Sequence, residues 1–136
     1  MTRVLVIAAN DAYFAVPMAR VHQVLRHPLV TRIPLSPAGL LGVVNVRGEI
    51  VPLLDTAVLT GTGSLNEPPF AVLVSGGEDM VALAAQDLPI AADFEEPVGP
   101  GSQAGEVGVY SDGGRLVVLI DVEELVKNRL DLKRAS

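Results

Sequence analysis

The sequence predicts a mainly β protein with two small lobes and one C-terminal helix, and three features lead to this fold class. Short aliphatic runs alternate with pairs of turn-forming residues, as in β-hairpins. One scheme of strand, polar turn, aliphatic strand and closing aspartate occurs twice, as GVVNVRGEIVPLLD at 42–55 and GEVGVYSDGGRLVVLID at 105–121. Only the last residues have the apolar spacing of an amphipathic helix. Because a lone hairpin is marginally stable, the repeat predicts two packed lobes with a groove between them.

The size and composition of the chain exclude several classes of function. Its 136 residues suit one compact domain. A net charge of −6 and only 4% aromatic residues argue against nucleic acid as a partner. The chain has no cysteine, which removes disulfides and thiolate metal sites and fits the cytoplasm. No apolar stretch approaches the roughly 18 to 20 residues of a membrane helix, so we expect a soluble protein without direct membrane insertion.

The expected strands are rich in valine, isoleucine and leucine and are bounded by turn residues. They cover 4–9, 12–16, 41–46, 50–54, 70–75, 80–84, 105–110 and 115–120. The stretch 21–25 is too short for its period to separate a strand from a helix. Two glycines make 60–66 a connector, and the acidic, Pro- and Gly-rich stretch 93–104 reads as a loop.

The expected helix begins after Asp121, which can cap it, and Glu124 can complete a capping box. The remaining helix residues separate into an apolar face and a late cationic group. The apolar face consists of Val122, Leu125, Val126 and Leu130, and the cations are Lys127, Arg129 and Lys133.

Arg47 is the one charged side chain at the tip of the first repeated hairpin. The order NVRG predicts a type I turn with Val46 and Arg47 at its centre and Gly48 as a left-handed bulge residue. The guanidinium would then project from the hairpin. A solubilising tip charge and a rigid anchor for a partner are both consistent with this placement.

The stretch YFAVPMARVHQVLRHPLVTRIPLSPAGLLGVVNVRGEIVPLLD resembles the CheW family, the adaptors of bacterial chemosensory arrays. The matching elements are the strand at 13–16, the segment at 21–24, TRIP at 31–34 and the block at 42–55. The resemblance implies one CheW-like domain over 1–136, made of two SH3-like five-stranded β-barrels with strand exchange and a lobe boundary near 56–68. It also implies a C-terminal helix after the second barrel.

The resemblance implies a function without catalysis. The chain would couple a CheA-type histidine kinase, through the regulatory domain of the kinase, to the cytoplasmic tips of chemoreceptors. It would act in chemotaxis or in gliding or twitching motility, in the cytoplasm and associated with arrays through the receptors. We expect no cofactor and no metal.

The resemblance also implies a partner-binding set centred on Arg47. Its expected members are Val21, Gln23, Val24, Gly42, Asn45, Arg47, Gly48, Ile50, Val81, Ala82 and Leu88. Gln23 stands where the family usually has glutamate, so no acid at that position pairs with Arg47.

The sequence raises four other interpretations besides the adaptor. An SH3-like module could bind peptides outside chemosensory arrays. A dimeric retroviral-type aspartic protease could use Asp55 in PLLDTA, but Ala57 stands where that site needs glycine. His22 and His27 lack the spacing of metal ligands on one helix face. GPGSQAG at 99–105 lacks the spacing of a dinucleotide-binding loop.

Overall fold

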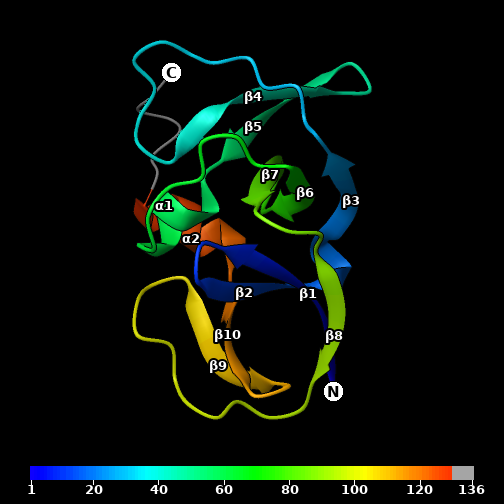
Figure 1. Ribbon diagram of the computed structural model, residues 1–136, viewed down its shortest axis with the longest axis vertical. Coiled ribbons are helices and arrows are strands. Elements are labelled where there is room, and N and C mark those ends of the chain that lie inside the picture. The colour runs from blue at the N-terminus through cyan, green and yellow to red at the C-terminus, as the bar shows by residue number, and fades with distance from the viewer. Residues whose placement is uncertain (130–136) are drawn as a thin grey trace.

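The structure, a computed structural model, describes residues 1–129 and contains two five-stranded sheets (Figure 1). The strands are β1 (Thr2–Ala9), β2 (Ala12–Pro17), β3 (Val21–Arg26), β4 (Leu40–Val46), β5 (Glu49–Leu54), β6 (Phe70–Gly76), β7 (Asp79–Ala85), β8 (Ile90–Phe94), β9 (Glu106–Asp112) and β10 (Arg115–Ile120). The helical segments are η1 (Met18–Arg20), α1 (Thr56–Thr60) and α2 (Val122–Arg129). No helix in this part of the chain is both long and apolar enough to cross a membrane.

Each sheet takes strands from both halves of the chain. The terminal sheet has the order β8-β1-β2-β10-β9, and the central sheet has the order β3-β6-β7-β5-β4. The hairpin β1–β2 therefore lies beside the last three strands, while β6–β7 lies beside β3, β4 and β5. Both sheets contain one parallel contact, β10 with β2 and β5 with β7. The segment 56–68, where the resemblance implies the lobe boundary, connects β5 to β6, and both of these strands belong to the central sheet.

Three elements differ from the sequence-based expectations. Residues 21–26 form a strand, which resolves the ambiguity of that stretch. β8 was missed because it is an edge strand in which Phe94 is the buried residue, so its sequence lacks the usual alternation. α1 was missed because it has only five residues. Asp55 caps α1, and Gly61 ends it with a φ of 76°.

The C-terminal helix begins where the sequence predicts, but its capping box is incomplete. The Glu124 N–H donates to Asp121 Oδ1 at 3.2 Å. The Asp121 N–H already donates to the carbonyl of Gly105 at 2.8 Å, which leaves the Glu124 carboxylate no donor to accept from. Leu130 and Lys133, expected on the apolar and cationic faces, lie outside the described residues.

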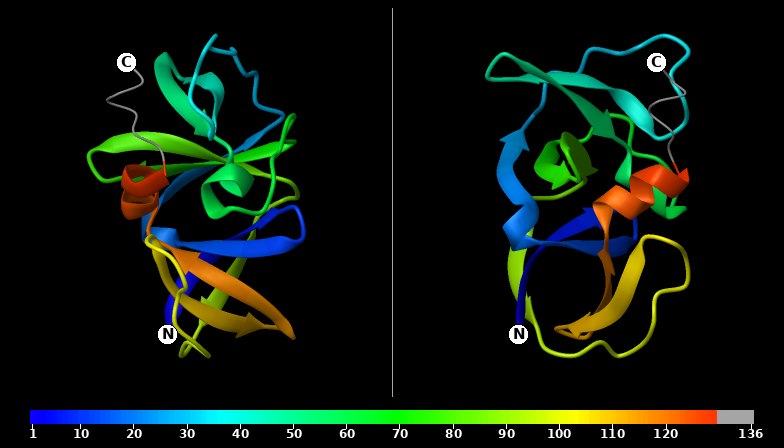
Figure 2. Two further views of the ribbon diagram at one scale, coloured as in Figure 1. Left: turned by 90° about the vertical axis from the view of Figure 1, so that its left-hand side faces the viewer. Right: turned by 180° about the vertical axis from the view of Figure 1, so that it is seen from behind.

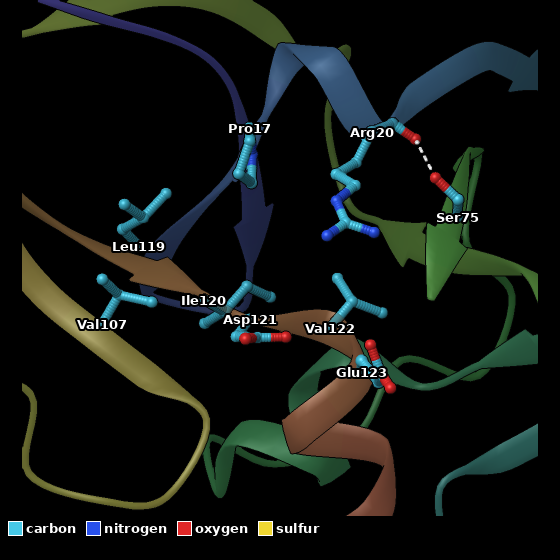
Figure 3. A pocket seen from close by; sticks show the side chains of 9 residues that line it. All are labelled: Pro17, Arg20, Ser75, Val107, Leu119, Ile120, Asp121, Val122 and Glu123. Carbon is cyan, nitrogen blue, oxygen red and sulfur yellow. Dashed lines mark hydrogen bonds between the residues drawn. The ribbon is translucent and has the colours of Figure 1, made fainter. Parts of the chain in front are cut away.

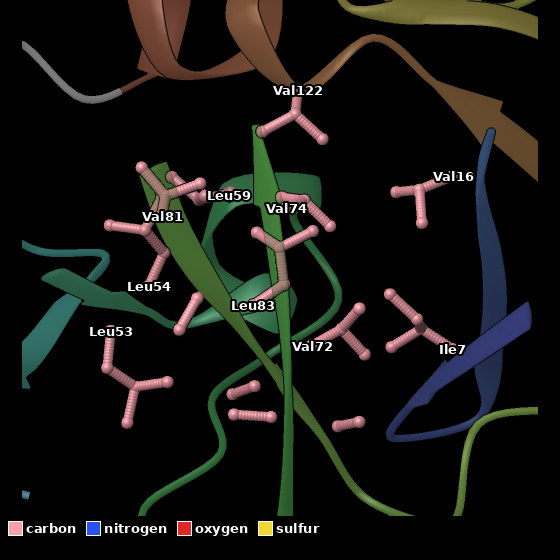
Figure 4. Close-up of a cluster of buried hydrophobic side chains, with 14 of the residues drawn as sticks. Ile7, Val16, Leu53, Leu54, Leu59, Val72, Val74, Val81, Leu83 and Val122 are labelled. Atoms are coloured by element: carbon pink, nitrogen blue, oxygen red, sulfur yellow. The ribbon is translucent and has the colours of Figure 1, made fainter. Parts of the chain in front are cut away.

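The main hydrophobic core crosses the boundary between the sheets. Ile7 and Val16 from the terminal sheet lie near Val72 and Leu83 of the central sheet and Val122 of α2 (Figure 4). A smaller cluster fills the terminal sheet alone and consists of Val4, Val6, Ala15, Phe94, Val117 and Leu119. β1 thus contributes to both clusters through its two faces. This sharing joins the two sheets through buried apolar contacts, and the views in Figure 2 show them stacked along the long axis of the molecule.

Candidate functional site

The tip of the β4–β5 hairpin is a two-residue turn formed by Arg47 and Gly48. Val46 pairs directly with Glu49, and the φ angles of Arg47 and Gly48 are 53° and 88°. Two successive left-handed residues are typical of a type I′ turn, so the predicted type I turn with a bulge was wrong. Type I′ prevails in two-residue hairpins because its twist matches the right-handed twist of the strands. Asn45 Oδ1 accepts the Gly48 N–H at 2.9 Å and braces the turn.

Arg47 is exposed, and its guanidinium forms no ion pair within residues 1–129. It borders a hollow of about 390 Å³ between the hairpin and strands β3, β6 and β7. The lining residues are His22, Gln23, Val46, Arg47, Glu49, Leu73 and Met80. An unpaired cation beside partly apolar walls can recognise an acidic residue on an amphipathic partner.

A second hollow, of about 610 Å³, adjoins the first on the other side of Glu49 and Met80. Ile50 lines it and is 64% exposed, which is unusual for a large aliphatic side chain on a strand. Glu78 and Asp79 lie along the same hollow. The hairpin therefore presents an arginine toward one hollow and an isoleucine toward the other.

The structure brings some of the expected site residues together and separates others. Gln23 and Arg47 line the first hollow, Ile50 and Val81 line the second, and Asn45 braces the turn by accepting the N–H of Gly48. Val21 and Val24 are partly buried on β3 and pack against the main core.

Three of the expected site residues lie away from this exposed surface. Ala82 is fully buried, so its side chain presents nothing to a partner. Gly42 is buried too, and a Cβ there would lie 2.4 Å from the carbonyl oxygen of Thr31. Gly42 thus permits the bridge between Thr31 and Val43. Leu88 lies beside Tyr13 and Arg115 at the terminal sheet.

Sequence reasoning missed five residues of the first hollow, namely His22, Val46, Glu49, Leu73 and Met80. Glu49 could have been found, because it follows the turn directly and lies two positions from Arg47. Leu73 and Met80 could not, because their place depends on the pairing of β6 with β7 and of β7 with β5. Neighbouring residues in the chain carry no signal of that pairing.

The environment of Asp55 is that of a structural cap rather than a catalytic carboxylate. The residue is 3% exposed. Its Oδ1 accepts the N–H groups of Ala57 and Val58 at 3.0 and 3.3 Å, and its Oδ2 accepts the N–H of Leu65 at 2.9 Å. Both oxygens are therefore occupied by backbone donors, which stabilise the start of α1 and the following loop.

Comparisons with known proteins agree on one family. Residues 3–130 match the CheW-like domain. Chemotaxis protein CheW of Klebsiella aerogenes is 23% identical over 137 residues, which cover 91% of this chain and 81% of the relative. Protein FrzA of Myxococcus xanthus is 31% identical over 115 residues, covering 77% of this chain and 71% of the relative.

The fold agrees as well. The crystal structure of the scaffolding protein TtCheW from Thermoanaerobacter tengcongensis superposes with a TM-score of 0.80 at 18% identity, covering 91% of this chain and 86% of that one. The prediction of a mainly β fold with two SH3-like five-stranded subdomains and a C-terminal helix is confirmed. The chain belongs to the family of CheW-like domains.

Proposed function

We propose that this CheW-like protein is a non-catalytic adaptor that couples a CheA-type histidine kinase to chemoreceptor tips in a bacterial chemosensory pathway. Family membership supports the adaptor class, and two of its relatives carry the names chemotaxis protein and scaffolding protein. The single observation that carries the assignment of a binding surface is the exposed Arg47, which forms no ion pair within residues 1–129 and lies on a braced hairpin beside two hollows.

The proposed receptor-binding surface, here called the hairpin surface, consists of Gln23, Val46, Arg47, Ile50 and Met80. Arg47 would form charge-assisted hydrogen bonds with a carboxylate of the partner, and Ile50 and Met80 would supply apolar area. Gln23 lines the same hollow and carries no charge that could neutralise Arg47. An amphipathic helix with an acidic residue next to its apolar face matches these groups.

The left-handed conformation of Arg47 supports a functional rather than a solubilising role. An L-residue other than glycine in this region costs roughly 1–2 kcal/mol. A charge could be placed at many exposed positions without that cost, whereas a strained residue at a binding tip is typical of a functional constraint. In this conformation Arg47 lines the first hollow, and the hydrogen bond from the Gly48 N–H to Asn45 Oδ1 braces the turn.

The test is recruitment of the Arg47→Glu variant to membranes that contain a chemoreceptor of the same bacterium. We expect at least a tenfold loss of co-sedimentation, equivalent to about 1.4 kcal/mol, with the thermal unfolding curve nearly unchanged because the side chain is exposed. The matched control is Arg26→Glu, an exposed arginine of the same sheet that lies over the ring of Phe70, away from the hollows. Equal recruitment of wild type and Arg47→Glu would remove Arg47 from the surface.

A further inference from the structure

A separate pocket of about 200 Å³ lies at the junction of the two sheets and α2 (Figure 3). Apolar side chains from β2, β9, β10 and α2 form its walls, and one hydroxyl and three charged side chains lie at its mouth. The walls are Pro17, Val107, Leu119, Ile120 and Val122, and the mouth is formed by Arg20, Ser75, Asp121 and Glu123. None of these residues belongs to the hairpin surface.

The unpaired charge at the mouth of this pocket is the guanidinium of Arg20. Glu123 forms an ion pair with Lys127 at 3.2 Å, and Asp121 caps α2 through Oδ1. Arg20 is held through its carbonyl oxygen, which accepts the Ser75 hydroxyl at 3.4 Å, while its side chain extends into the pocket (Figure 3). Within residues 1–129 the guanidinium has no acidic partner. A ligand at this mouth would therefore be favoured by a carboxylate.

The first repeat contains the equivalent of this site in an occupied form. Asp55 and Asp121 close the two repeated hairpins, and each caps the helix that follows. The second oxygen of Asp55 accepts the N–H of Leu65, whose side chain is buried in the main core. The second oxygen of Asp121 accepts no hydrogen bond from the described residues, and Asp121 is exposed beside the pocket. By analogy with Leu65 in the first repeat, a residue that binds the open oxygen of Asp121 would be aliphatic and would donate its backbone N–H.

We propose that the pocket docks a short extended segment of a partner protein in which an aliphatic residue lies close to an acidic one. The aliphatic side chain enters between Val107 and Val122, its backbone N–H donates to Asp121 Oδ2, and the acidic side chain pairs with Arg20. The volume of the pocket suits one side chain and not a helix. Because the site shares no residue with the hairpin surface, it gives the protein a second, independent contact.

The chain itself supplies a probe for this site. The segment 62–68, TGSLNEP, contains Leu65 on the Asp55 carboxylate and an acid two residues later. The acetylated and amidated peptide of this sequence is titrated into the ¹⁵N-labelled full-length protein and followed by NMR. We expect a Kd of about 1 mM, as for a single anchoring side chain. The shifted amides should be those of Val107 and of residues 120–123.

Three variants and two control peptides make the test specific. Arg20→Glu should weaken binding at least fivefold through charge reversal. Asp121→Asn keeps an oxygen for the cap and places an amide donor against the peptide N–H, so it should also weaken binding at least fivefold. Arg47→Glu should leave peptide binding unchanged, and Arg20→Glu should leave receptor recruitment unchanged. Peptides with serine in place of leucine, or glutamine in place of glutamate, should bind more weakly.

The proposal is overturned if no shift appears at these amides up to about 5 mM peptide, well above the expected Kd. It is equally overturned if Arg20→Glu and Asp121→Asn bind the peptide as well as wild type does. The C-terminal residues of the chain itself include an aliphatic one, Leu132, that could compete with the peptide for the pocket. A tenfold gain in peptide affinity in Leu132→Ser would show such competition and contradict docking of a partner protein. Loss of recruitment in Arg47→Glu without peptide binding at the pocket would leave the hairpin surface intact and reject only this second site.

Discussion

The two repeated hairpins follow the same local plan but differ in what their tips and caps do. Both turns consist of two left-handed residues, Arg47–Gly48 between β4 and β5 and Gly113–Gly114 between β9 and β10. Both closing aspartates donate their N–H to a glycine carbonyl, Asp55 to Gly39 at 2.7 Å and Asp121 to Gly105 at 2.8 Å. The difference is that one tip carries an arginine and the other a glycine, and that one aspartate is buried and the other exposed.

This comparison separates what the fold needs from what binding needs. The fold needs residues that accept a positive φ at the turn, and glycine meets that need without strain in the second hairpin. Arg47 adopts the same backbone at a cost, which supports the binding role that we propose for its side chain. In the same way, both carboxylate oxygens of the buried Asp55 accept backbone N–H groups and so stabilise the fold. The exposed Asp121 uses Oδ1 for its cap, which leaves Oδ2 available to a ligand in the proposed site.

The largest expected effect comes from removing the buried cap. Asp55→Ala should lower the free energy of unfolding by about 3 kcal/mol, because it removes a helix cap and leaves the Leu65 N–H buried without an acceptor. Asp121→Ala should cost about 1 kcal/mol, since within residues 1–129 the Asp121 side chain accepts a hydrogen bond only from the exposed N–H of Glu124. Urea denaturation of both variants measures the difference. Equal losses would show that the two caps are equivalent and contradict the comparison.

The next largest loss of stability is expected from alanine substitution at one of two glycines that occupy corresponding places in the two repeated hairpins, Gly42 on β4 and Gly108 on β9. A Cβ at Gly42 would lie 2.4 Å from the Thr31 oxygen, whereas a Cβ at Gly108 meets nothing closer than 3.4 Å. Gly42→Ala should therefore destabilise by about 2 kcal/mol through a backbone shift, and Gly108→Ala by less than about 0.5 kcal/mol. Thermal unfolding of the pair checks this. A stable Gly42→Ala protein would mean that the loop before β4 adapts freely.

The smallest expected effect on stability is a gain. Arg47→Asn should raise the free energy of unfolding by about 0.5 to 1 kcal/mol, because Asn-Gly is a preferred pair in type I′ turns. Gly113→Arg should lower it by a similar amount, since it introduces the same strain in the second hairpin. Receptor recruitment should fall in Arg47→Asn and stay unchanged in Gly113→Arg. A loss of stability in Arg47→Asn would show that the arginine makes a stabilising contact instead.

Much of the fold and part of the site follow from local sequence. The exposed Arg47 could be predicted because a polar residue between two aliphatic runs has no buried place to go. Its turn type could not, because the twist of paired strands decides between the available turns. The burial of Ala82 could not be predicted from the sequence either. It arises because its strand, β7, lies between β6 and β5, which cover both edges of β7. The resemblance placed Leu88 in one partner-binding set with Arg47, and in the structure Leu88 lies beside Tyr13 and Arg115 at the terminal sheet.

Local sequence determined most of the strand segments, the positions of the two hairpin turns and the capping aspartates, because each depends on hydrogen bonds and sterics within a few residues. It also determined the repeat, from which two similar lobes follow. Only the tertiary structure decided that the hairpin β1–β2 joins β9 and β10 while β6–β7 joins β4 and β5, and that one closing aspartate is covered while its counterpart stays open. Those outcomes depend on strand pairing and burial between residues far apart in the chain, and such contacts form only when the whole core assembles.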